Sequence, residues 1–243
     1  EKAEDLIQQE YGLTADGADL KIEVHTLDGQ SGVLAYVSGS PGADGKYYNQ
    51  ELHIDLDDFT PGDLPNGGTS PNYNDRIIAH EMVHAVMGRT MNFASLPTWF
   101  KEGTAEFIHG ADERVTGDLA AAGGNAQTIV DQLDGAWGSG SIDYSAGYTA
   151  TKYLHSNIGG NRIKDIMTFL STTPGSALDN ALANEGTSAD TATFLADFKV
   201  NGANYINNTM NLGDADTGSI GGSDHGGGSL DAANVVPDIT NLT

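Results

Sequence analysis

The stretch NDRIIAHEMVHAVMGRT, residues 74–90, decides how the rest of the chain is interpreted. Apolar residues recur in it at helical spacing, and His80 and His84 stand four residues apart. Because an α-helix has about 3.6 residues per turn, both imidazoles lie on one face and can reach the same ion. Glu81 is rotated by about 100° from His80, so it lies beside such an ion without binding it and can accept a proton from water. The stretch therefore predicts a metal-binding helix of the HExxH type.

A second stretch, WFKEGTAEF at residues 99–107, can supply a third ligand. Pro97 suits the first turn of a helix, which would place Glu102 and Glu106 one turn apart on one face. Catalytic zinc takes three protein ligands and keeps one position open, and two histidines with one glutamate are a known set. One carboxylate could bind zinc while the other accepts a hydrogen bond from a ligand imidazole. Gly103 would let this helix approach another helix closely.

These stretches resemble those of the gluzincin metallopeptidases, and the E-G-x-A-E form is similar to that of bacterial collagenases. The region from about Asn74 to Arg114 is most similar to the flagellinolysin family, whose peptidase domain is inserted in bacterial flagellins. The resemblance implies a thermolysin-like unit with a sheet-bearing lobe and a helical lobe, and a place in a flagellar filament for the full-length protein. By the gluzincin pattern, the zinc ligands are His80, His84 and Glu102, the general base is Glu81, and Glu106 is the acid that hydrogen-bonds a ligand imidazole.

A third stretch, DYSAGYTATKYL at residues 143–154, contains candidates for stabilising the transition state. Hydrolysis of a peptide bond develops an oxyanion, which a phenol or an imidazolium near the metal can stabilise. The stretch resembles the gluzincin helix that carries a transition-state tyrosine three residues ahead of a glycine, and Tyr144 occupies that position. Tyr148 and His155 share the same predicted helical face and remain alternatives, and the tyrosines could instead be core residues.

The remaining histidines and several aspartates are weaker candidates. His25 and His53 alternate with charged residues on predicted strands and are expected to face solvent. His109 ends a predicted helix, where a cation suits the helix dipole, and a structural role is expected. Ca²⁺ is a further candidate cofactor, since hard cations take carboxylate oxygens. Its candidate ligands form two clusters, Asp55, Asp57 and Asp58, and Asp214 with Asp216.

The order of the predicted elements indicates an α+β fold. A short helix (1–12) and three strands (20–25, 33–37 and 52–57) come first, with loops expected at 38–45 and 60–72. Helices are expected at 74–90, 97–110, 142–157, 161–171 and 188–208, and weaker helical stretches at 113–134 and 175–185. We expect a single catalytic unit over 1–243 with a sheet-bearing lobe (1–92), a helical lobe (93–210) and a Gly/Asp-rich tail (211–243).

Composition limits the functions that this chain can have. Eleven basic residues against 34 acidic ones give a formal net charge of −23 over 243 residues, which argues against nucleic acid and anionic membranes as partners. Cysteine is absent, so disulfides, thiol nucleophiles and cysteine-ligated metals are excluded. The strongly acidic character favours an extracellular location.

The sequence therefore predicts a zinc-dependent endopeptidase that acts on protein or peptide substrates. An exposed sheet edge, taken to be the strand at 51–57, could hold the substrate extended. Two other classes stay open, a catalytically inactive surface or filament-display domain and a calcium-dependent adhesion module. The intact Glu81 argues against the first, because a purely structural site needs no base beside an open coordination position. The acidic charge and the Gly/Asp-rich tail motivate the second.

Overall fold

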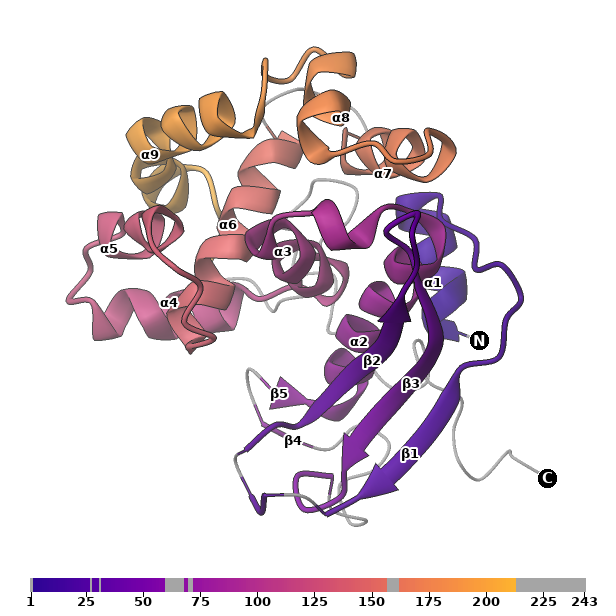
Figure 1. The fold of residues 1–243 in the computed structure, drawn as a ribbon. Coiled ribbons are helices and arrows are strands. Elements are labelled where there is room, and N and C mark those ends of the chain that lie inside the picture. Colours follow the sequence, from indigo (N-terminus) through magenta and orange to yellow (C-terminus); the bar gives the residue numbers. More distant parts are fainter. Residues whose placement is uncertain are drawn as a thin grey trace.

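The computed structural model describes residues 2–26, 28–30, 32–59, 68–69, 72–156 and 162–212. The strands lie in the first part of the chain and helices make up the rest (Figure 1), so the predicted α+β class is confirmed. Within these residues no helix is both long and apolar enough to cross a bilayer. In chain order the elements are α1 (Lys2–Tyr11), β1 (Lys21–His25), β2 (Ala35–Pro41), β3 (Tyr47–Asp55), β4 (Gly68–Thr69), β5 (Asn72–Tyr73), α2 (Asn74–Thr90), η2 (Phe93–Ser95), α3 (Thr98–His109), α4 (Asp112–Ala121), α5 (Gln127–Val130), η3 (Asp131–Asp134), α6 (Ser141–Ser156), α7 (Arg162–Thr172), α8 (Leu178–Asn184) and α9 (Thr191–Asn208).

The main sheet has three strands in the order β1-β3-β2, and β4 and β5 form a separate pair. β3 runs parallel to β1 and antiparallel to β2. The strand expected at the sheet edge, 51–57, is therefore central, and that prediction is wrong. The reason is the hairpin of β2 and β3, which extends through most of the expected loop at 38–45: backbone pairing reaches Pro41 and Tyr47, although apolar alternation stops earlier. The outer strands are β1 and β2.

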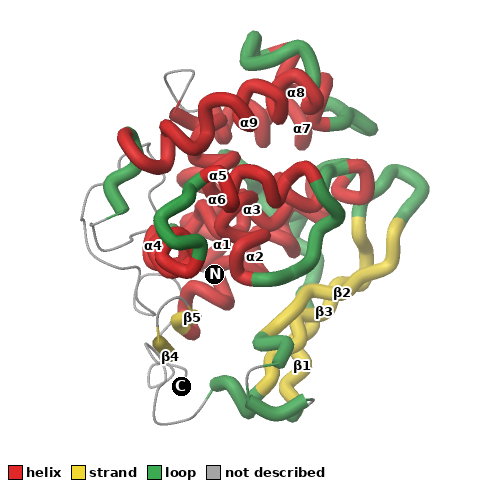
Figure 2. Tube along the Cα trace, turned by 90° about the vertical axis from the view of Figure 1, so that its left-hand side faces the viewer, coloured by secondary structure: helices red, strands yellow, loops and turns green. Residues whose placement is uncertain are grey.

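One face of the sheet packs against α2, and the views in Figures 1 and 2 place this helix beside the strands. Gln50 and Leu52 of β3 are buried on this face. A Cβ atom on Gly88 of α2 would lie 2.4 Å from Nε2 of Gln50. Gly88 therefore allows β3 to approach the helix closely, and the helix continues beyond it to Thr90.

Three helices, α2, α3 and α6, form the interior of the molecule. α2 is buried almost all round, which explains why its sequence is not strongly amphipathic. α1 packs on this interior through Tyr11, whose hydroxyl donates a hydrogen bond to the carbonyl oxygen of Thr104 at 2.5 Å. Apolar residues from most helices join one continuous core, including Ile7, Val83, Met87, Phe100, Phe107, Leu154, Ile166, Leu182 and Phe198.

The crossing of α3 and α6 depends on two glycines. A Cβ atom on Gly103 would lie 2.2 Å from the carbonyl oxygen of Gly147, and a Cβ on Gly147 would lie 2.9 Å from the carbonyl oxygen of Trp99. The backbones are therefore in direct contact, as expected for Gly103. This contact sets the distance between the helix that carries Glu102 and the helix that carries Tyr144.

Two expected helices have different bounds in the structure. The weak helical stretch at 113–134 is divided into α4, α5 and η3, because Gly123 and Gly124 adopt positive φ angles of 65° and 83°. The helix expected at 188–208 begins at Thr191, since the Asp190 side chain caps it by accepting a hydrogen bond from the N–H of Thr193 at 2.7 Å. The Gly/Asp-rich tail lies outside the described residues beyond 212.

We predict that Gly103→Ala destabilises the protein, because the new Cβ would overlap the carbonyl oxygen of Gly147. Overpacking of this kind costs about 1–3 kcal/mol. Gly117→Ala in α4 is the matched control: no described atom lies within 4 Å of its Cβ position, and alanine should stabilise the helix by up to about 1 kcal/mol. Urea unfolding of both variants measures the difference, and equal effects would contradict the close helix contact.

Candidate metal centre

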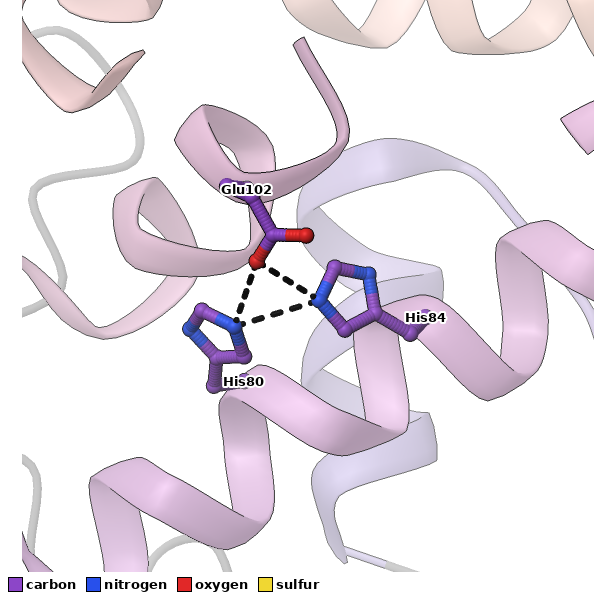
Figure 3. Close-up of side chains that lie close together, drawn as sticks. All are labelled: His80, His84 and Glu102. Atoms are coloured by element: carbon purple, nitrogen blue, oxygen red, sulfur yellow. Dashed lines mark hydrogen bonds and ion pairs between the residues drawn. The ribbon is translucent and has the colours of Figure 1, made fainter. Parts of the chain in front are cut away.

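The structure brings His80, His84 and Glu102 together from two helices. Nε2 of His80 and Nε2 of His84 lie 3.1 Å apart, and Oε2 of Glu102 lies 3.2 Å from the first and 3.1 Å from the second. Figure 3 shows the three side chains pointing at one another, the histidines from α2 and the glutamate from α3. The helical spacing predicted for the two histidines thus gives two donors on one face, and α3 supplies the third.

This triangle of donor atoms fits a tetrahedral zinc ion. Ligand bonds of about 2.0–2.1 Å place neighbouring donors of such an ion about 3.3 Å apart, close to the three distances observed. Two imidazoles and one carboxylate are a ligand set used by catalytic zinc, and three protein ligands leave a fourth position open. The donor set and its spacing therefore suit zinc better than Ca²⁺, which prefers six to eight oxygen ligands.

Glu106 lies behind His80 and holds its other ring nitrogen. Oε1 of Glu106 is 3.0 Å from Nδ1 of His80, and Nε of Arg114 donates to Oε2 of Glu106 at 3.1 Å. Hydrogen bonding of Nδ1 fixes the ring so that Nε2 faces Glu102. His84 has no such carboxylate at its Nδ1 atom, which is buried without a hydrogen-bond partner among the described residues.

A second group of three donors, His80, Glu106 and His109, also converges. Its carboxylate is already paired with Arg114, so little negative charge is left for a cation. Burial lowers the pKa of His109 to about 3, even though Glu106 opposes the shift. His109 is therefore neutral and structural in the protein alone, and the group that contains Glu102 is the better cation site.

The electrostatics of the centre favour positive charge. Burial opposes the ionisation of Glu102, but the two histidines outweigh it and hold the pKa of this carboxyl well below its usual range. Burial likewise opposes the ionisation of Glu106, and Arg114 and His80 hold its pKa well below the usual range. Burial alone would lower the pKa of His80, yet the two carboxylates raise it to about 10. A site that retains a proton this strongly is one that stabilises a cation.

Glu81 is buried beside the centre and does not belong to the donor triangle. Burial raises the pKa of this carboxyl above its ordinary value, against the opposing effect of His80 and His84. The backbone N–H of Val37 on β2 lies near this carboxylate and opposes the shift, lowering its pKa. The outer edge of β2 therefore faces the residue predicted to be the general base, and β2 replaces the 51–57 strand as the edge next to the centre.

A cavity of about 510 Å³ opens against His80 and Glu81. Its walls come from the segment before β2 and from α2, α3, α4 and α6, and include residues 32–35, Arg76, Ile77, Glu106, His109, Arg114, Ser139, Ser141 and Tyr144. The Tyr144 ring centroid lies 6.1 Å from that of His80. Burial, assisted by the carboxylates of the centre, raises the pKa of Tyr144 to about 12, so its phenol stays protonated at neutral pH.

The two alternatives to Tyr144 lie elsewhere. The Tyr148 hydroxyl donates to Oδ1 of Asp112 at 3.0 Å and accepts from Nζ of Lys152 at 2.9 Å. All three side chains are buried, so Tyr148 belongs to a network that joins α4 to α6. His155 packs with its ring centroid 5.2 Å from that of Phe107 and does not line the cavity. Of the three candidates, the structure brings Tyr144 to the centre.

Sequence reasoning missed the two arginines of the cavity. Arg76 is fully buried and forms an ion pair with Glu113 at 3.1 Å, and Arg114 lies with its Cζ 5.4 Å from the centroid of the Tyr144 ring. A compositional signal was present: the chain has only four arginines, and these two fall within the stretch 74–114 that carries the motif. Their pairing across α2, α3 and α4 could not be read from spacing.

The aspartate clusters do not come together as a calcium site within the described residues. The carboxylate of Asp55 is buried and accepts hydrogen bonds from the backbone N–H groups of Asp57 at 3.0 Å and Asp28 at 3.4 Å. These bonds organise the turn after β3. Asp214 and Asp216 lie outside the described residues, and calcium binding stays a prediction.

We predict that Tyr148→Phe lowers the free energy of unfolding by about 1–3 kcal/mol, because the buried Asp112 loses a hydrogen-bond donor. Tyr144→Phe is the matched control. The Tyr144 hydroxyl makes no hydrogen bond within the described residues, so its removal should change stability by less than about 0.5 kcal/mol. Urea unfolding checks both values, and a Tyr144→Phe variant that is the less stable of the two would reverse the assignment.

No family model, curated protein or solved structure matches this chain. Its function is therefore inferred from its own residues, chiefly from the donor triangle of His80, His84 and Glu102 and from the buried Glu81 beside it.

Proposed function

We propose that this chain is a zinc-dependent endopeptidase of the gluzincin type, in which His80, His84 and Glu102 hold Zn²⁺. The observation that carries the proposal is the convergence of their three donor atoms at 3.1–3.2 Å. A buried glutamate and a cavity adjoin this triangle, which is what a hydrolytic centre requires and a purely structural zinc site does not.

The residues around the centre divide the chemistry between them. Zinc, when bound, supplies a Lewis acid that activates a water molecule and polarises the peptide carbonyl. Glu81 accepts the proton of the attacking water and then delivers it to the leaving amine, a role that its raised pKa suits. Tyr144 donates a hydrogen bond to the oxyanion that develops on the carbonyl. Glu106 keeps Nδ1 of His80 hydrogen-bonded, so that Nε2 remains directed at the metal.

We further propose that substrate binds in extended form along the outer edge of β2, between a sheet-bearing lobe and a helical lobe arranged as in thermolysin-like enzymes. Two observations support this. The backbone N–H of Val37 lowers the pKa of Glu81, and β2 packs against α2, so the edge of β2 lies beside the base. The cavity wall at residues 32–35 leads directly into β2. A peptide that pairs with this edge gains main-chain hydrogen bonds without any demand on its sequence. An extracellular location and a place in a flagellar filament stay predictions from charge and resemblance.

The first test separates metal binding from catalysis. The wild-type protein should retain about one zinc per chain after dialysis, as expected for three ligands of the right type. Glu81→Gln should retain the zinc but lower turnover on a peptide library by about 10²–10⁴, because the base is lost while the ligands remain. Glu185→Gln, with the same charge change far from the motif, is the control.

Two results would contradict the proposal. Metal-free wild-type protein that still cleaves peptides would exclude zinc catalysis. Zinc-loaded wild-type protein that cleaves no peptide of a broad library would favour the filament-display or adhesion classes.

A second prediction concerns Tyr144. Tyr144→Phe should lower kcat by about 10²–10³ with KM nearly unchanged, since a donor that binds only the developing oxyanion contributes nothing to substrate affinity. Zinc content should be that of the wild type. Steady-state kinetics on the best library peptide measure the effect. A wild-type kcat would show that Tyr144 merely lines the cavity.

A further inference from the structure

A second cluster of histidines lies on the face of the main sheet that is turned away from α2. Side chains alternate between the two faces of a strand, and Gln50 and Leu52 are buried on the α2 side. His53 of β3 therefore lies on the opposite face. Glu23 of β1 is directly opposite His53 in the strand register, and His25 follows Glu23 by two residues on the same face. The expectation that both histidines simply face solvent is wrong, because both are half-buried, their rings lie side by side, and His53 stacks on a tyrosine.

The two imidazoles are as close as the imidazoles of a metal site. The ring centroids of His25 and His53 are 5.2 Å apart, against 4.8 Å for His80 and His84 in the candidate zinc centre. Two imidazoles bound to one tetrahedral ion have centroids about 5 Å apart, given zinc–nitrogen bonds of about 2.0–2.1 Å. Tyr36 stacks on the far side of His53, with centroids 4.4 Å apart and an interplanar angle of 9°, which restrains the ring.

Hydrogen bonding leaves a lone pair of His53 available. Nε2 of His53 lies 3.2 Å from Oγ of Ser38 and 3.5 Å from Oε2 of Glu51. A carboxylate can only accept, so the ring hydrogen belongs on Nε2 and the lone pair on Nδ1. Among the described residues, Nδ1 of His53 is buried without a hydrogen-bond partner, and so is Nε2 of His25. Buried polar atoms without partners are rare in native proteins, and an ion is one of the ways in which they are satisfied.

Glu23 is the third donor within reach. Glu23 is opposite His53 in the strand register, and the Lys21 ammonium, with smaller effects of His53 and His25, lowers its pKa. Lys21 pairs with Glu23 and also with Glu51, at 3.1 Å from the latter. In the described part of the chain, the only groups of three converging donor residues are the two that contain His80. The donors at the sheet are therefore not yet assembled around one point. At the sheet a metal ion has to displace Lys21 from the exposed Glu23 side chain.

We propose that His25, His53 and Glu23 form a second metal site, for a divalent transition ion such as Zn²⁺ or Cu²⁺. Imidazole nitrogen suits these ions and not Ca²⁺ or Mg²⁺. The site would join β1 to β3, the parallel pair of the sheet, and an ion that binds only the folded protein stabilises it by mass action. It uses no residue of the His80 centre and does not depend on the peptidase proposal.

The test is a zinc titration by calorimetry of the His84→Ala protein, in which the first centre lacks a ligand. One binding event should remain. His25→Gln and His53→Gln, each added to this background, should weaken it by more than the 10–100-fold typical of a residue that only supports a ligand. Lys21→Met should tighten it by about twofold to fivefold, because a competing cation is removed. Glu10→Gln is the charge control for Glu23→Gln and should leave the affinity unchanged.

A second measurement does not depend on the folding of the His84→Ala variant. Cu²⁺ added to zinc-loaded wild-type protein should give an electron paramagnetic resonance signal with coupling to two nitrogens, and this signal should be lost in His25→Gln and His53→Gln. Unchanged zinc affinity and an unchanged copper signal in these two variants would overturn the proposal.

Discussion

The buried carboxylate of Glu106 is the constraint on which the metal centre depends. A charge removed from water is tolerated only if it is paired and hydrogen-bonded. Glu106 on α3 meets this condition through His80 on α2 and Arg114 on α4. Three helices are thereby tied at one point. One turn earlier on α3, Glu102 then faces the two Nε2 atoms of α2.

The placement of cations in this acidic chain separates the roles of the two glutamates of α3. Arg114 neutralises Glu106, whereas Glu102 has no arginine or lysine partner among the described residues and faces the two imidazoles. Glu102, the glutamate of the donor triangle, is therefore the one whose carboxylate is available to bind an ion. The net charge of −23 therefore says little about the centre itself, where two of the four arginines are concentrated.

Local patterns predicted the helices well, because they depend on spacing within one segment. The bounds expected for α2 agree with the structure, and those for α3 and α6 agree within one residue at each end. The sheet was predicted less well: β2 stays paired with β3 through residues such as Ser38 and Ser40, whose side chains give no strand signal. The contact of Arg114 with Glu106 and that of the His25 ring with the His53 ring join different elements. Such contacts depend on tertiary packing, which cannot be predicted from the periodicity of apolar residues in the sequence.

The burial of α2 on nearly every side has an evolutionary consequence. Substitutions in this helix, and in the part of α3 that packs on it, would disturb the core and the candidate metal centre together. The cavity has another wall, at residues 32–35 and Ser139, which lies at the start of β2 and in the segment before α6, outside the helical interior. Changes there can alter the shape of the cavity without disturbing the donor triangle. A lineage of such proteins can therefore vary the cavity through these two segments without altering the helical interior.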